Sequence, residues 1–408
     1  MEPTALIREF KKHGWRMVPN PYSVVLELIE EDSPLLFDIA EAAVRELDTA
    51  PTFLVELLSH LDEEKLGRLA ELAVELGDEN ECRFAVLSAA AYQSPAVLKP
   101  HLEYLSSLTV GPPTDMNPAW RTADEREVAR LEASVSAGEA REDLQRLFET
   151  QRLDVIDHAL GLPPAMDEKS VQSWALDSTL RISDRRASFL DTGPCHHLLF
   201  SPADPGDENG GPARMMALHP THQLVSDDDF RRAFGGTLTG NCGLCGDSLH
   251  RLMDFSALPA AFKVRAQRLI IGTCLSCLGW EQETLSYRHG DDGLPHTLDG
   301  DGHFSEPQSP AEPLAETIVR ISPTPYRWQE QRYGDRQNMH RLGGRPSWVQ
   351  WADFPKCQQC QKVMPFLAQF DSNIETESGG EWLWGSGGAC YVFWCDDCRV
   401  SALKWQCT

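Results

Sequence analysis

Two short cysteine motifs decide the fold: Asn241–Gly246 (NCGLCG) and, with 28 residues between the two cysteine pairs, Cys274–Leu278 (CLSCL). Each Cys-x-x-Cys turn can place two thiolates on one side of a metal ion, so a second turn completes a tetrahedron. A second set of two such turns follows, with 34 residues between them. Both separations exceed the roughly 15 to 20 residues of common zinc ribbons, so we expect strands between the turns. The predicted metal ligands are Cys242, Cys245, Cys274 and Cys277 in one set, and Cys357, Cys360, Cys395 and Cys398 in the other.

The chemistry of these cysteines favours two structural Zn²⁺ sites. Zn²⁺ prefers four soft ligands in a tetrahedron and has no redox chemistry of its own. Disulfides are disfavoured, since no secretory signal opens the chain and its apolar content is ample for a core. One thioredoxin-like pair would leave three other pairs unexplained, whereas an iron–sulfur cluster stays open as an alternative. The four remaining cysteines, Cys82, Cys195, Cys390 and Cys407, are expected to be buried apolar residues.

Apolar periodicity divides the chain into a helical first half and a β-rich second half, an α+β protein. Asp62 is a good N-cap for a helix over 63–76, where leucines recur at helical spacing. Short apolar runs between Gly, Pro and Asp clusters after residue 185 indicate strands. We expect an acidic α-helical domain at 1–110, a linker and helical connector at 111–184, a zinc-binding β-rich repeat at 185–290, a flexible linker at 291–314, and a second zinc-binding repeat at 315–408.

The two cysteine regions have the pattern of an internal duplication. Each has a Gly-Gly pair, a Cys-x-x-Cys turn, an apolar strand, a hairpin and a second Cys-x-x-Cys turn. The offset is 115 residues at Cys242/Cys357, Leu249/Met364, Leu252/Leu367 and Phe255/Phe370. A unit this small buries a limited core, so metal binding, worth about 10 to 16 kcal/mol for structural zinc, is expected to help it fold.

Three segments of the second repeat carry a family resemblance: 339–350 (MHRLGGRPSWVQ), 355–360 (PKCQQC) and 364–369 (MPFLAQ). They resemble the YwqG-like family of bacterial proteins. They are also similar to the zinc-containing C-terminal domain of the eukaryotic programmed-cell-death-protein family, whose members act as chaperones of ribosomal proteins. The resemblance covers about the last 90 residues closely and 185–290 loosely, and leaves out the helical half.

The resemblance implies a binding protein more than an enzyme. Most YwqG-like proteins have no assigned activity, and their genes often lie beside toxin–immunity loci. We therefore expect a non-catalytic, zinc-stabilised protein-binding module from a bacterium, acting as an immunity or antitoxin-type factor or as a dedicated chaperone. No partner-binding residue is carried over from either family.

The net charge of the chain limits the class of partner that we expect it to bind. The chain has 37 Lys+Arg against 62 Asp+Glu, a formal net charge of −25, which disfavours nucleic acid as the main partner and favours a basic protein. Residues 1–150 contain 14 basic and 29 acidic residues and so account for −15 of this charge. The sequence has no apolar run of about 18 residues, so we expect no membrane span and a cytoplasmic location.

An enzymatic alternative is a thiol- or metal-dependent hydrolase at Cys195, His196, His219 and His222. A cysteine near histidines can be a nucleophile and base or a metal site. No Asp or Asn to orient a histidine is evident, and Cys195 to His197 alternate along a predicted strand, so only half of them share a face.

Two further groups are candidates for partner binding. Arg332, Arg336 and Arg341 lie in the longest basic stretch of an acidic chain, although a strand whose arginines pair with acidic neighbours is the favoured explanation. Trp382 and Trp384 alternate on one strand beside glycines and could form an exposed contact site. Packing in the core is the competing role for both tryptophans.

Overall fold

The computed structural model describes residues 2–77, 80–108, 113–138, 141–162, 167–190, 193–200, 218–222, 231–262, 264–300, 305–307, 310–322 and 337–408. Its helices are α1 (Pro3–His13), α2 (Pro21–Glu30), α3 (Leu35–Glu46), α4 (Thr52–Ser59), α5 (Glu63–Leu76), α6 (Glu81–Gln93), α7 (Leu102–Ser107), α8 (Glu125–Ala137), α9 (Arg141–Glu149), α10 (Leu153–Gly161) and α11 (Glu168–Asp177), with 3-10 helices η1 (Gly14–Arg16), η2 (Pro95–His101), η3 (Pro113–Thr122), η4 (Pro220–His222) and η6 (Ala260–Phe262).

The strands follow the helices. They are β1 (Leu180–Ser183), β2 (Arg186–Phe189), β3 (His196–Leu199), β4 (Arg231–Phe234), β5 (Thr237–Asn241), β6 (Ser248–Asp254), β7 (Ile270–Thr273), β8 (Leu285–His289), β9 (Pro295–Thr297), β10 (Thr317–Ile321), β11 (Arg341–Leu342), β12 (Phe366–Asp371), β13 (Ile374–Glu375), β14 (Glu381–Trp382), β15 (Ala389–Cys395) and β16 (Val400–Gln406). The predicted order, a helical half followed by a β-rich half with two tetracysteine sets, is confirmed.

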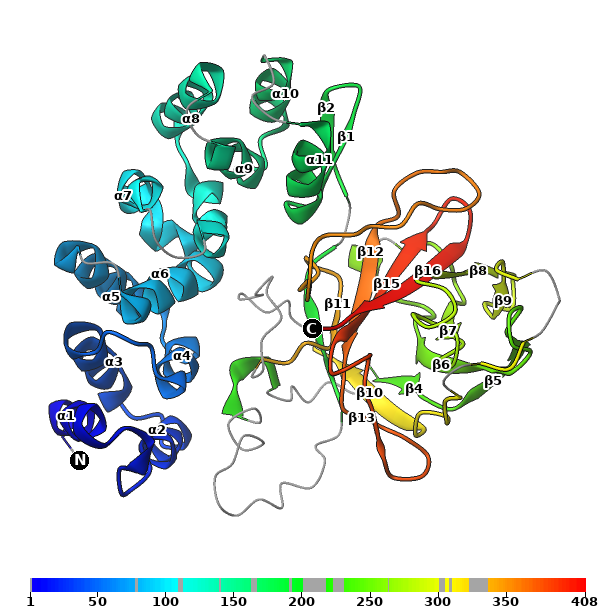
Figure 1. The fold of residues 1–408 in the computed structure, drawn as a ribbon, viewed down its shortest axis with the longest axis horizontal. Coiled ribbons are helices and arrows are strands. Elements are labelled where there is room, and N and C mark those ends of the chain that lie inside the picture. The colour runs from blue at the N-terminus through cyan, green and yellow to red at the C-terminus, as the bar shows by residue number, and fades with distance from the viewer. Residues whose placement is uncertain are drawn as a thin grey trace.

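The helices stack on one another in chain order, which we call the helical array. Contacts link helices that are close in the chain, as α2 packs on α3 and α4 and α3 packs on α5, and Figure 1 shows the resulting arc beside the β-rich half. Helix α5 has the predicted bounds because the Asp62 carboxylate accepts a hydrogen bond from the Lys65 N–H at 2.9 Å and Gly77 ends the helix with φ +67°.

The first β hairpin belongs to the helical array. Residues Leu180 and Ala187 lie in the same apolar core as the helices, and the Ala187 N–H donates to the Asp157 carboxylate at 2.7 Å. Positive φ values at Asp184 and Arg185 fit the tight two-residue turn between the strands. The predicted boundary at residue 185 therefore falls inside this hairpin.

The other long strands form one sheet, which we call the sheet module. Its order is β5-β6-β4-β10-β3-β11-β12-β15-β16-β8-β9, with β7 paired to β6. Strand β9 also approaches the opposite end, since Pro295 lies against the backbone of Gly240 in β5 and of Gly272 in β7. The sequence predicts a flexible linker over 291–314, but Pro295–Thr297 is strand β9, paired to β8. This part of the segment is thus sheet.

Strand register repeats between the two halves of the sheet module. We call β3–β8 the first unit and β10–β16 the second unit. Met253 pairs with Phe234 and with Ile271 in the first unit, and Ala368, 115 residues later, pairs with Leu342 and Val392 in the second. Register shifts fall between Arg251 and Met253 and between Phe366 and Ala368, again 115 residues apart. The duplication therefore includes both the strand pairing and the register shift, which is typical of a β-bulge.

The two units are interleaved through their first strands. Strand β3 of the first unit pairs with β11 of the second, and β10 of the second pairs with β4 of the first. Strands β3 and β10 also pair with each other, with Leu199 opposite Arg320. Neither unit thus completes its sheet with its own strands. On either side of the β3–β10 pair the next two strands correspond, β4 and β6 to β11 and β12, whereas β8 and β9 extend only the side of the second unit.

A buried ion pair joins the helical array to the sheet module. The Arg345 guanidinium donates to both carboxylate oxygens of Glu149 in α9, at 2.7 and 2.8 Å, and also to the Asp177 carbonyl oxygen. The Arg121 guanidinium lies 3.6 Å from the same carboxylate. Burial acts to raise the pKa of Glu149, but the charge and hydrogen bonds of Arg345 hold it below its ordinary value. Burial raises the pKa of Asp177 to about 6.

Candidate metal centres

Each predicted set of four cysteines comes together within one unit of the sheet module. The sulfur atoms of Cys242, Cys245, Cys274 and Cys277 form the first metal centre, and those of Cys357, Cys360, Cys395 and Cys398 form the second. Within each centre all four sulfurs lie within 4.8 Å of one another. The two Cys-x-x-Cys turns of each metal centre therefore belong to the same unit. The spacing of the cysteines alone did not decide this pairing.

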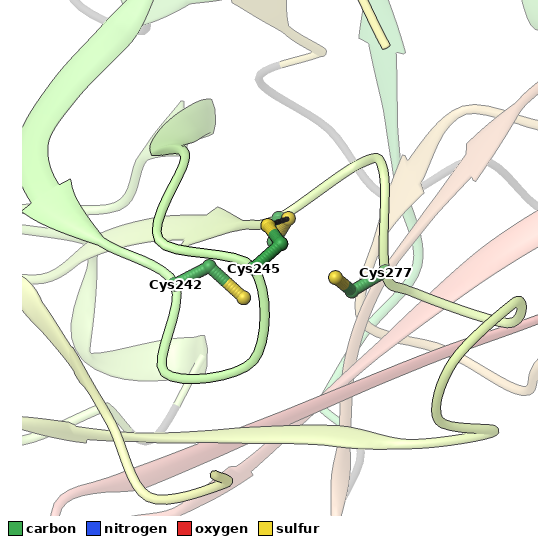
Figure 2. Close-up of side chains that lie close together, drawn as sticks. Cys242, Cys245 and Cys277 are labelled. Carbon is green, nitrogen blue, oxygen red and sulfur yellow. Dashed lines mark hydrogen bonds between the residues drawn. The ribbon is translucent and has the colours of Figure 1, made fainter. Parts of the chain in front are cut away.

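The sulfur spacing fits one tetrahedral ion in each centre. The Sγ atoms of Cys245 and Cys274 lie 3.6 Å apart, and those of Cys360 and Cys395 lie 3.8 Å apart. A tetrahedron with metal–sulfur bonds of about 2.3 Å has sulfur–sulfur edges of about 3.8 Å. Figure 2 shows the side chains of Cys242, Cys245 and Cys277 gathered around a common point.

The first turn of each centre has the same hydrogen bonding. In the first centre the Cys242 N–H donates to the Asp247 carbonyl at 2.8 Å, and the Gly246 N–H donates to the Cys242 carbonyl at 3.0 Å. In the second centre the Cys357 N–H and the Gln361 N–H make the equivalent bonds, both at 2.9 Å. Gly246 and Gln361 both have positive φ, at +80° and +59°. This reversal aims both thiols of the turn at one point.

The second turn of each centre is positioned by a strand end. Cys274 directly follows β7, and Cys395 is the last residue of β15. The last three residues of β7 and all residues of β15 are buried. The chain therefore reaches each metal centre along a rigid strand, and only the three residues after it need to turn. The Tyr287 hydroxyl accepts a hydrogen bond from the Cys274 N–H at 3.0 Å and fixes this point further.

Close approach of the sulfurs perturbs their acidity. A hydrogen bond from the Cys274 thiol is the largest factor that lowers the pKa of Cys242 to about 5, and the same contact raises the pKa of Cys274. In the second centre the Lys362 N–H lowers the pKa of Cys360, while burial raises that of Cys395. Negative charge thus concentrates on one sulfur of each set. A bound divalent cation would instead stabilise negative charge on all four sulfurs.

Side chains of the candidate hydrolase residues form hydrogen bonds with other residues, although His219 and His222 pack edge-on against each other. Cys195 is buried, which raises the pKa of its thiol, and its sulfur is hydrogen bonded with Arg341. The His196 Nδ1 lies 2.7 Å from the Ser322 carbonyl, and the His219 Nδ1 lies 2.7 Å from the Thr221 hydroxyl. Among the residues that the structure describes, Cys195, His196, His219 and His222 form no cluster of metal ligands.

The candidate partner-binding residues are mostly enclosed. Arg341 and Trp384 both have an exposed fraction of 0%, which is incompatible with direct contact to a partner. Trp384 instead donates from Nε1 to the Asp371 carbonyl at 3.0 Å, and half-buried Trp382 packs edge-on against it. The prediction of an exposed tryptophan pair is therefore wrong for Trp384. Arg332 and Arg336 lie outside the described residues.

Of the four cysteines outside the centres, Cys82, Cys195 and Cys390 are buried as predicted, while Cys407 is only half-buried.

No feature of the sequence indicated the contact between Arg345 and Glu149, since these residues are 196 positions apart. No helix in the described ranges combines the length and apolarity that a membrane crossing requires.

Comparison with known proteins adds one partial relative. No protein-family profile matches the sequence, and no solved structure matches the chain. The chain is 41% identical over 69 residues to an uncharacterized protein, YpfL, of Salmonella typhimurium. That match covers 17% of this chain and 15% of the relative. The fold and the two tetracysteine centres thus define an α+β metal-site protein, and its function is inferred from its own structure.

Proposed function

We propose that this protein is a non-catalytic binding protein, stabilised by two structural zinc ions, that captures a basic partner protein on its helical array. The observation that carries the proposal is the charge of the array surface. Between residues 21 and 93, the described exposed side chains include twelve acidic ones and two basic ones, Arg45 and Arg68. The acidic ones are Glu27, Glu30, Glu31, Asp32, Asp38, Asp48, Asp62, Glu63, Glu64, Glu71, Glu75 and Glu81.

Part of this charge lies at turns between helices of the array. Two of the turns between helices carry a share of it, the turn from α2 to α3 and the turn from α4 to α5. The first turn carries Glu30, Glu31 and Asp32, and the second runs from Asp62 into Glu63 and Glu64. A surface of one sign attracts partners of the opposite sign and raises their association rate.

The metal centres support a structural role for the ions. Catalytic zinc sites keep one coordination position open for water or substrate, whereas a site with four cysteine ligands is closed. Each centre here offers four sulfurs, so zinc would be saturated by the protein and would hold the two turns of its unit together. Zinc is proposed because four thiolates at this spacing are its usual structural ligands.

The finer role we propose is that of an immunity or antitoxin-type factor or of a dedicated chaperone for the basic partner. Both roles need a stoichiometric complex, and they differ in what the free partner does. An immunity factor neutralises a partner whose activity harms the cell when this protein is deleted. A chaperone escorts a partner that aggregates in that case and leaves the complex when it reaches its final assembly.

The experiment is affinity co-purification of the tagged protein from its native cells at moderate salt. We expect one stoichiometric companion protein of basic composition, released as the salt concentration rises. A triple variant, Glu31→Gln, Glu63→Gln and Glu64→Gln, should recover several-fold less of it. The matched control removes three exposed carboxylates from the sheet module: Glu306→Gln, Glu375→Gln and Glu377→Gln. No companion, or equal loss in both variants, would contradict the proposal.

A further inference from the structure

A groove lies where the helical array, the first unit and the second unit meet. Its volume is about 420 Å³. Arg181, Phe189 and Leu190 come from the hairpin of the helical array, Phe262 comes from the first unit, and residues 362–367 and 394–397 come from the second. Small-molecule sites usually have volumes of about 300 to 1,000 Å³ and are common at domain junctions.

Four aromatic side chains line the groove together with aliphatic and charged ones. Phe262, Phe366 and Trp394 are buried in its walls. Phe189 also lines it, and half of its surface is exposed. An aromatic ligand would bury apolar surface here and could make edge-to-face contacts with these rings. The lining therefore favours a flat apolar group over a sugar or a metal ion.

The charged side chains at the groove differ in whether they have a partner of opposite charge. The Asp396 carboxylate accepts hydrogen bonds from the Arg265 guanidinium and from Trp394 Nε1, and Asp397 accepts one from Arg265 at 2.8 Å. The Lys362 ammonium lies 3.5 Å from Asp397. Arg181 has no side-chain partner among the described residues, although it is half-buried. The groove thus contains one guanidinium without a side-chain partner among the described residues, and two carboxylates that already have cationic partners.

We propose that this groove binds a small aromatic carboxylate, with the ring against Phe189, Phe262 and Trp394 and the carboxylate paired with Arg181. A guanidinium recognises a carboxylate through two parallel hydrogen bonds, which gives both strength and orientation. The site is separate from the acidic surface of the array and does not depend on the proposed function. Because its walls belong to both halves of the protein, a bound ligand stabilises their present arrangement.

Calorimetric titration of the full-length, metal-loaded protein with indole-3-acetate tests the proposal, and indole-3-acetamide is the matched uncharged ligand. We expect the acetate to bind and the amide to bind about tenfold more weakly or worse, because a charge-assisted hydrogen bond is lost. Arg181→Gln should weaken acetate binding by a similar factor. Arg186→Gln, an exposed residue of the same hairpin outside the groove, should leave it unchanged.

A second variant tests the aromatic wall without disturbing the core. Phe189→Ala removes a half-exposed ring and should weaken acetate binding several-fold, while the melting temperature of the free protein stays close to that of the parent. Absence of acetate binding to the parent protein would overturn the proposal. Equal affinities for acetate and amide, or equal affinities of the parent and Arg181→Gln, would overturn it as well.

Discussion

The helical array and the sheet module reach a folded state by opposite routes. Helices of the array pack on neighbours in the chain and share one continuous apolar core that extends into the first hairpin. Strands of the sheet module pair with distant partners: β8 lies beside β16, with Leu285 opposite Leu403. Two separate apolar clusters also divide its core. We therefore expect local stacking to be sufficient for the array, and we propose that the module depends on long-range pairing and on metal bound at its two centres.

Loss of a metal centre should have the largest effect and should separate the two regions. Structural zinc is worth about 10 to 16 kcal/mol, more than the total stability of most domains. We expect chelation to unfold the sheet module and Cys277→Ser to unfold its first unit, with the array remaining helical in both cases. Tryptophan fluorescence follows the module, because eight of the eleven tryptophans lie after residue 279, and circular dichroism at 222 nm follows the helices.

Cys407→Ser is the control for that prediction, since Cys407 belongs to neither centre. It should keep both signals at their original values. Simultaneous loss of fluorescence and helical signal on chelation would show that the array also depends on metal, and the proposed difference between the regions would then be wrong.

Acidification should also act on the sheet module first. Burial lowers the pKa of His197 to about 3, of His289 to about 4 and of His340 to about 3. Protonation below the unfolded value of about 6.5 therefore favours the unfolded state, so this stability is present above pH 6.5 and lost as the pH falls. Three such groups remove about 5 kcal/mol between pH 6.5 and 5.

The measurement is an acid titration followed by the same two signals. Fluorescence should change at a higher pH than the helical signal does. Protonation of the cysteine ligands acts in the same direction, so zinc release should accompany the fluorescence change. Helix loss at a higher pH than either event would contradict the prediction.

Breaking the ion pair between the regions should have a smaller effect. Arg345→Met leaves the buried Glu149 carboxylate with Arg121 at 3.6 Å and Ser178 at 3.0 Å as its remaining partners. Removing one member of a buried pair costs about 3 to 5 kcal/mol, whereas replacing both members is often nearly neutral. In thermal unfolding we therefore expect the transitions of the two regions to separate in Arg345→Met and to converge again when Glu149→Gln is added.

Arg45→Met is the matched surface control, since Arg45 pairs with Glu41 on an exposed helix face at 2.7 Å. Exposed pairs of this kind contribute about 0.3 to 0.5 kcal/mol. If Arg45→Met lowered the stability as much as Arg345→Met does, the ion pair between the two regions would be no more important for stability than an exposed pair.

The smallest expected effect is local to the array. Asp62→Ala removes the carboxylate that accepts the Lys65 N–H at the start of α5, which should lower stability by about 1 kcal/mol. Asp62→Asn keeps an acceptor and should restore most of it. Hydrogen exchange should show faster opening of the first turn of α5, with protection in the sheet module unchanged. Faster exchange in β15 would contradict the independence of the regions.

Local features of this fold could be predicted from the sequence. Asp62 and Gly77 delimit α5 because a cap and a left-handed glycine are local effects, and the Cys-x-x-Cys turns identify both metal centres because ligand geometry depends on spacing. The duplication was visible at offset 115 because core positions such as Phe255 and Phe370 keep their apolar character.

Pairing between distant segments could not be predicted in the same way. Alternation along a strand shows which side chains face a core, but it does not name the neighbouring strand, so the interleaving of β3 and β10 was not predictable. Arg341 and Trp384 belong to residue types that are common at protein interfaces, yet both are buried by segments that close over them in space. Arginine burial depends on partners such as Glu149 that only the tertiary structure supplies.

Metal content tests the central claim most directly. Native mass spectrometry with elemental analysis, on protein purified without added metal, should find two zinc ions per chain. Cys277→Ser should lose the ion of the first centre, Cys360→Ser that of the second, and Cys407→Ser neither. Iron with inorganic sulfide, disulfide-bonded cysteines without metal, or a single ion shared between the units would contradict the account of two structural zinc centres.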